Sequence, residues 1–104
     1  MASFPLDMQA VMDKEIGLLA LAEMYEDDMS ADLVITVDGG RYSVTLRSST
    51  QPIILPDAEL LTSAGKLVSL HGKYGTRLQS VAYRYEKDSI GSWDWSVVFE
   101  YDRR

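Results

Sequence analysis

Residues 93–102 carry the strongest structural pattern in this 104-residue chain. Large apolar side chains recur there at every second position, namely Trp93, Trp95, Val97, Phe99 and Tyr101. Polar residues fall between them, and only Val98 breaks the alternation. A period of two is typical of a β-strand that buries one face, and a slip of one residue would place a row of acids in the core. We therefore expect this strand to be well specified and its aromatic face to form much of the core.

Three more segments alternate in the same way: 33–37, 42–47 and 78–86. The first two are separated by the sequence Asp-Gly-Gly-Arg at 38–41, and glycine supplies the positive φ that a tight hairpin turn requires. The third leads through a polar, glycine-containing connection at 87–92 into the aromatic strand. These patterns predict two antiparallel hairpins.

The region 6–26 has apolar residues at helical spacing and predicts a helix, with Ser3 as a candidate N-cap. Eight residues share its predicted apolar face: Met8, Val11, Met12, Ile16, Leu18, Leu19, Ala22 and Tyr25. Glu15 falls in the middle of this face. It is expected to extend to solvent along the apolar surface or to pair with an arginine of the sheet; the alternative is a carboxylate of raised pKa in a pocket.

A second helix is expected from about 57 to 71, with an interior glycine, Gly65, at which it could break into two pieces. His71, at its end, is interpreted as a capping or surface residue. Together these elements predict a single α+β domain spanning 1–104. Its element order is helix, hairpin, helix, hairpin, and its helices form a layer on a four-stranded, mainly antiparallel sheet. The last two residues, Arg103 and Arg104, are expected to form a frayed end.

Composition excludes several functional classes. The chain has no cysteine and a single histidine, so disulfides, thiolate metal sites and most catalytic triads are excluded. It has no apolar run of eighteen residues, so no membrane span is expected, and no secretory signal is evident. The net charge of −6 argues against nucleic acid as a ligand. These features fit a cytoplasmic protein with no cofactor or metal.

Negative charge is concentrated in the first part of the chain. Residues 1–40 contain nine acids and one lysine, a net charge of −8, whereas residues 41–104 contain seven acids and nine bases, a net charge of +2. Five acids lie at or just after the predicted end of the first helix: Glu23, Glu26, Asp27, Asp28 and Asp32. Acids near a helix C-terminus oppose the helix dipole, so folding alone does not require them. We interpret them as a binding site for a basic protein partner.

The same cluster has two alternative roles. The acids could simply keep the chain soluble. Asp27, Asp28 and Asp32 could also bind a cation, although the oxygen spacing and the glycine of a calcium loop are missing.

The element order and the final strand ending in Phe99-Glu100-Tyr101-Asp102, in a small, acidic, cysteine-free chain, resemble the immunity proteins of bacterial polymorphic-toxin and contact-dependent growth inhibition systems. The resemblance rests mainly on residues 81–102. It implies a cytoplasmic bacterial protein that binds one cognate toxin, often a basic nuclease, and covers its active site. It does not indicate which residues of this chain bind the toxin.

The sequence therefore favours a non-enzymatic inhibitor with the five acids as its partner-binding site and no catalytic residue. One alternative is an acidic nucleic-acid mimic that regulates a DNA-binding protein. Another is a small enzyme that uses carboxylates such as Glu15 or Asp94 in a pocket. The partner's identity and the oligomeric state stay open.

Overall fold

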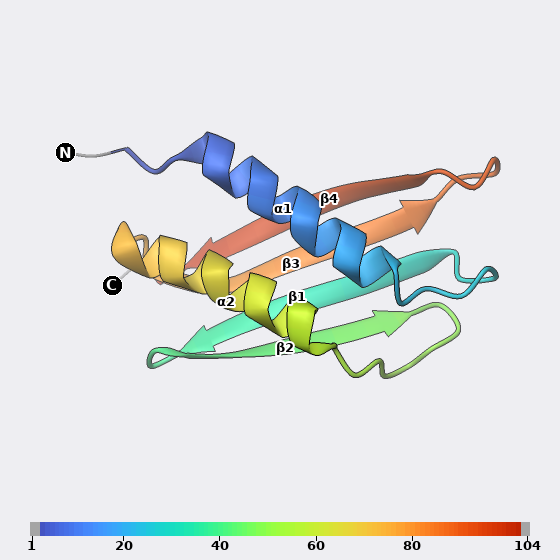
Figure 1. Cartoon of the computed structure of the whole chain (residues 1–104), viewed down its shortest axis with the longest axis horizontal. Coiled ribbons are helices and arrows are strands. Elements are labelled where there is room, and N and C mark those ends of the chain that lie inside the picture. The colour runs from blue at the N-terminus through green and yellow to red at the C-terminus, as the bar shows by residue number, and fades with distance from the viewer. Residues whose placement is uncertain (1–2, 103–104) are drawn as a thin grey trace.

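The computed structural model describes residues 3–102 of the chain. Its elements are α1 (Leu6–Leu21), β1 (Ser30–Asp38), β2 (Arg41–Ser48), α2 (Ala58–Lys73), β3 (Leu78–Lys87) and β4 (Trp93–Tyr101). The strands form one antiparallel sheet in the order β2-β1-β3-β4, and both helices lie on the same face of it (Figure 1). The predicted α+β class with a four-stranded antiparallel sheet is confirmed. The C-terminal arginines, expected to fray, lie outside the described residues.

The core is built on the two central strands. Its fully buried sheet residues come mainly from β1 and β3: Ala31, Leu33, Ile35, Val81, Tyr83 and Tyr85. They pack against Ile16 and Ala20 of α1 and against Leu60, Ala64 and Leu67 of α2. Because neighbouring strands pair in register, side chains at paired positions, such as Leu33 and Tyr83, point to the same face.

The aromatic strand β4 lies at the edge of the sheet and is less buried than its sequence predicts. Trp95 is 51% exposed and Tyr101 41% exposed, although Trp93, Val97 and Phe99 are partly buried against the core. An edge strand has a neighbour on one side only, so helices that cover the central strands leave part of its inner face in solvent. The alternation is therefore real, but the core is not centred on this strand.

Helix α1 ends five residues earlier than predicted and is rotated about its axis relative to the predicted face. Pro5, not Ser3, is its N-cap residue. Its buried residues are Gln9, Asp13, Ile16 and Ala20. Val11 and Leu18 are each 66% exposed. Glu15 is exposed as well, and it accepts a hydrogen bond of 2.9 Å from Ser63 of α2 instead of pairing with an arginine of the sheet.

A buried polar network explains this rotation. The Asp13 Oδ1 accepts hydrogen bonds from the Tyr83 hydroxyl at 2.6 Å and from the Gln9 amide nitrogen at 2.7 Å. The Gln9 amide oxygen lies 2.7 Å from His71 Nε2, and His71 Nδ1 lies 2.9 Å from the Thr76 hydroxyl. Since α1 is apolar on several faces, the polar partners on α2 and β3 decide which face turns inward.

His71 is therefore a core residue and not a surface residue as interpreted from sequence; it is only 2% exposed. Because the Gln9 nitrogen donates to Asp13, the Gln9 oxygen is left to accept from His71 Nε2–H, and the Thr76 hydroxyl then donates to Nδ1. Burial lowers the pKa of the His71 ring, against an opposing effect of the Asp13 charge. The neutral ring serves as a donor and an acceptor at once.

Helix α2 is continuous through Gly65, so the predicted alternative of two pieces is wrong. Asp57 caps it by accepting a 2.8 Å hydrogen bond from the Leu60 amide. Gly65 makes room for Tyr42 of β2, because a Cβ at Gly65 would stand 2.6 Å from the Tyr42 hydroxyl oxygen. That hydroxyl donates to the Leu61 carbonyl oxygen at 2.9 Å. The glycine thus allows a strand side chain to lie against the helix backbone.

This contact predicts an unusual response to Gly65→Ala. Alanine normally stabilises a helix interior by about 1 kcal/mol relative to glycine. Here the new methyl group displaces Tyr42 and breaks its hydrogen bond, so the free energy of unfolding, measured with urea, is expected to fall by about 1 kcal/mol. In a Tyr42→Ala background the same change should raise it by about 1 kcal/mol.

Gly72→Ala is the matched control, because a Cβ at Gly72 meets nothing within 4 Å. It is expected to stabilise the protein in both backgrounds. Equal effects of Gly65→Ala with and without the Tyr42 side chain would contradict the proposed contact.

Candidate functional site

The acidic residues predicted to bind a partner do not lie in the last turn of a helix. Because α1 ends at Leu21, four of them fall in the irregular segment 22–29 between α1 and β1, here called the acidic connection. The fifth, Asp32, lies within β1. The structure gives these five residues three different environments.

Asp28 is fully buried and serves the protein's own structure. Its Oδ1 accepts from the Ser48 hydroxyl at 2.6 Å and from the Thr50 amide and hydroxyl at 3.0 and 2.5 Å. Its Oδ2 accepts from the Tyr25 amide at 2.8 Å and the Gln51 side chain at 2.9 Å. Burial alone would raise the pKa of this carboxyl, but the hydrogen bonds outweigh it and hold the pKa well below its usual value. Asp28 therefore joins the acidic connection to the segment that follows β2.

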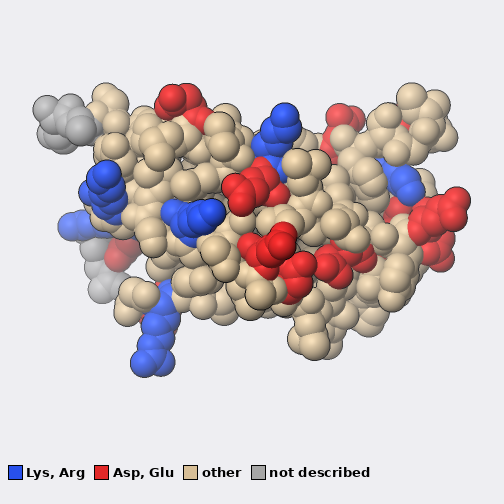
Figure 2. All heavy atoms as spheres, viewed as in Figure 1, with Lys and Arg blue, Asp and Glu red and all other residues tan. Residues whose placement is uncertain are grey.

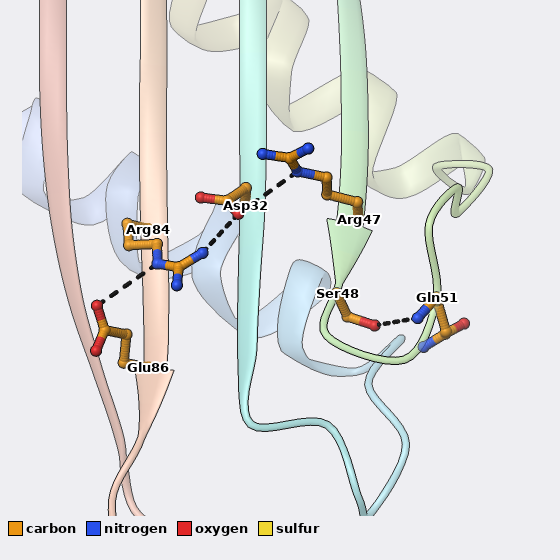
Figure 3. Close-up of polar contacts among 6 residues, drawn as sticks. All are labelled: Asp32, Arg47, Ser48, Gln51, Arg84 and Glu86. Carbon is orange, nitrogen blue, oxygen red and sulfur yellow. Dashed lines mark hydrogen bonds and ion pairs between the residues drawn. The ribbon is translucent and has the colours of Figure 1, made fainter.

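Asp32 is neutralised by arginines of the sheet. It lies on the face opposite the helices, between Arg84 of β3 at 2.6 Å and Arg47 of β2 at 3.6 Å (Figure 3). Arg84 also contacts Glu86 at 3.5 Å. The inference that folding does not require these acids is therefore wrong for Asp28, and Asp32 already has partners within the sheet.

The remaining three acids, Glu23, Glu26 and Asp27, form no ion pair within residues 3–102. Glu26 and Asp27 are exposed, and Glu23 is half-buried. The Lys87 ammonium donates to the backbone carbonyl oxygen of Glu26 at 2.8 Å and not to its carboxylate. This leaves a net negative surface at one end of the molecule.

Apolar and acidic groups meet at this end. Tyr25 and Met29 of the acidic connection are 61% and 51% exposed. In Figure 2 the red acidic side chains gather over the middle of the helical face and at the end where the acidic connection lies, whereas blue basic side chains prevail at the opposite end. Charge with adjacent exposed aromatic and methionine side chains is suited to contact with another protein.

The other candidate carboxylates are not gathered into a catalytic arrangement. Glu15 lies in the groove between α1 and α2, beside Ser63 and Lys66, and Asp94 lies on the open face of the sheet beside Arg84 and Glu86. Within the part of the chain that the structure describes, no three histidine or acidic side chains are grouped as they would be around a metal ion. In particular, Asp27, Asp28 and Asp32 do not converge.

No protein-family model matches the chain, and no curated protein matches its sequence. Among the described residues, neither helix has the length and apolar character needed to cross a membrane.

Sequence reasoning missed Asp28 as a structural residue and missed the network of Gln9, Asp13 and His71. The hydroxyl-rich segment 48–50 was the available signal for Asp28, since such residues often satisfy a buried carboxylate. For Asp13, the helical spacing of Gln9, Asp13, Ile16 and Ala20 was present but masked by the apolar residues on the other faces of α1.

Proposed function

We propose that this chain is a non-enzymatic binding protein that neutralises a basic protein partner, and specifically a cytoplasmic bacterial immunity protein that blocks a cognate toxin. The observation that carries the proposal is the surface formed by Glu23, Glu26 and Asp27, which has no internal counter-ions among the described residues. A cationic partner would supply positive counter-ions for these three carboxylates.

Rigidity of the acidic connection supports this function. The buried Asp28 side chain holds the loop by five hydrogen bonds, so Glu26 and Asp27 are presented on an ordered backbone. A pre-ordered surface loses less conformational entropy on binding. Tyr25 and Met29 add apolar area next to the charges, and such area contributes affinity while the charges contribute the rate of association.

The nucleic-acid mimic receives less support than the toxin inhibitor. Such a mimic needs an extended row of free carboxylates, and Asp28 and Asp32 already have partners within the protein. The enzyme alternative is also less supported, since Glu15 and Asp94 are both exposed and lie on different faces.

Reversal of the exposed charges tests the proposal. The proposal predicts that a neighbouring gene encodes a large secreted protein, and the C-terminal domain of that protein is the partner for the assay. The double variant Glu26→Lys, Asp27→Lys is expected to slow association with that domain at least tenfold at low salt, because electrostatic steering raises association rates by about 10 to 1,000-fold. Added salt should reduce the difference between variant and wild type. Melting temperature should stay within about 2 °C, as neither side chain has an ion pair.

The matched control is Asp7→Lys with Asp38→Lys, which changes the net charge equally at exposed sites outside the acidic connection. It should leave association nearly unchanged. In a bacterial growth assay, the neighbouring domain should be toxic alone and harmless with the wild-type chain. An untoxic domain, or equal association rates for both double variants, would reject the proposed function.

A further inference from the structure

A second surface, separate from the acidic connection, is a groove between α1 and the edge strand β4. It encloses about 440 Å³ and is lined by Asp13, Lys14, Leu18, Leu21, Tyr85 and Trp95, among others. That volume is within the range of small-ligand sites in proteins. Two polar groups in its wall lack a partner within the described residues: one has no hydrogen bond and the other has no ion pair.

The first is the Tyr85 hydroxyl. Tyr85 is only 1% exposed, and its oxygen is the one buried side-chain polar atom among the described residues that has no hydrogen-bond partner. Burial, together with the Asp13 charge, raises the pKa of this phenol, so it remains protonated. Gly17 of α1 faces it without a side chain, since a Cβ there would lie 3.6 Å from the hydroxyl oxygen. A buried, unpaired hydroxyl is costly and is expected to find a partner.

The second is the Asp13 carboxylate. It is 7% exposed and forms no ion pair with a cation in residues 3–102. Its two hydrogen bonds come from neutral donors, Gln9 and Tyr83, and both end on Oδ1. Buried carboxylates are usually paired with a cation, so a positive group bound in the groove would stabilise the negative charge of Asp13.

The third feature is the Trp95 indole, which forms the outer wall. Trp95 is paired with Tyr85 across β3 and β4 and therefore points to the same side of the sheet. It is 51% exposed, which leaves much of its ring available. Leu18 and Leu21 line the opposite, helical side of the groove with apolar surface. A flat cation with an aliphatic stem fits such walls, because it can stack on the indole while its stem lies along the leucines.

We propose that this groove binds an arginine side chain of the basic partner, with the guanidinium donating to Asp13 and to the Tyr85 oxygen and stacking on Trp95. The inference rests on the proposed function for its partner. Arginine suits the groove better than lysine because it is planar and has five donors in a fixed arrangement. An anionic ligand would be repelled by Asp13. Lys14 also lines the groove, and its positive charge repels a bound cation, so the removal of that charge is a further test.

The experiment titrates the isolated protein with N-acetylarginine amide and follows the side-chain indole N–H signals of both tryptophans by NMR. The Trp95 indole signal is expected to shift and to reach saturation at millimolar concentrations of the ligand. A Kd in this range corresponds to a binding free energy of about −4 kcal/mol. Trp93 serves as an internal control, because it lies outside the groove, with the Lys87 ammonium 5.6 Å from its ring centroid. The neutral isostere N-acetylcitrulline amide should bind at least about tenfold more weakly, since it lacks the charge.

Variants separate the contributions of the walls. Trp95→Leu and Asp13→Asn should each weaken arginine binding at least about fivefold. Because Trp95→Leu removes the indole signal, binding to that variant is followed by the backbone amide signal of Gly17. Lys14→Gln should strengthen it, because a like charge is removed. Saturation that is equal for arginine and citrulline, shifts that are equal at Trp93 and Trp95, or weaker binding by Lys14→Gln would overturn the proposal.

Failure here is distinguishable from failure of the proposed function. If arginine does not bind but reversal of Glu26 and Asp27 still slows association, the groove proposal fails and the acidic surface stands. If arginine binds as expected and charge reversal has no effect, the groove stands and the acidic surface fails.

Discussion

Replacing Asp28 with alanine is expected to lower the free energy of unfolding by about 3 kcal/mol, one of the largest effects of any polar substitution in this chain. The carboxylate is fully buried and accepts hydrogen bonds from Tyr25, Ser48, Thr50 and Gln51. Its removal leaves these donors without an acceptor and disconnects the acidic connection from the segment after β2. For a domain of this size the melting temperature should fall by about 15 °C.

Asp27→Ala is the matched control, because the neighbouring side chain is exposed and the variant should change stability by less than about 0.5 kcal/mol. Unfolding by urea, followed by tryptophan fluorescence, gives both values. Similar stabilities of the two variants would show that the Asp28 hydrogen bonds contribute little to the fold.

The pH dependence of the Asp28 effect has a definite sign. The pKa of this carboxyl is lowered in the folded protein, so the unfolded chain binds more protons in the acidic range. The stabilisation is therefore fully present above the unfolded pKa of about 3.9 and is lost progressively as the pH falls below it. The stability difference between wild type and Asp28→Asn should accordingly be constant near neutrality and shrink below about pH 4.

A second large effect is expected from the paired substitutions Tyr83→Phe and Tyr85→Phe, which remove the same atom from adjacent inward-facing residues of β3. The Tyr83 hydroxyl donates to the buried Asp13 carboxylate at 2.6 Å, so its loss should cost about 2 kcal/mol. The Tyr85 hydroxyl has no partner, so Tyr85→Phe should leave stability unchanged or raise it by up to about 1 kcal/mol.

The two variants bury nearly the same ring area, so the difference in their free energies of unfolding isolates the hydroxyl groups. A loss of about 2 kcal/mol or more for Tyr85→Phe would show that its hydroxyl has an internal partner and would weaken the groove proposal. A stabilised Tyr85→Phe protein that binds arginine derivatives more weakly would show that this hydroxyl is retained for binding at the expense of stability.

Sequence alone determined the elements of this protein because their signals are local. Period-two alternation identified all four strands, and the glycines at 39 and 40, both with positive φ, mark the predicted turn. Both helices were found as well. In each case the decisive information lies within a few residues of the position concerned.

Only the tertiary structure decided which of the patterned surfaces are covered. The most aromatic strand is at the sheet edge because sheet order depends on pairing between β1 and β3, which are far apart in the chain. The rotation of α1 depends on Asp13 meeting Tyr83 of β3, and the role of Asp28 depends on donors about twenty residues away. Charge in a sequence shows where acids are concentrated, whereas burial and partners decide which of them remain free to act, and these are properties of distant contacts.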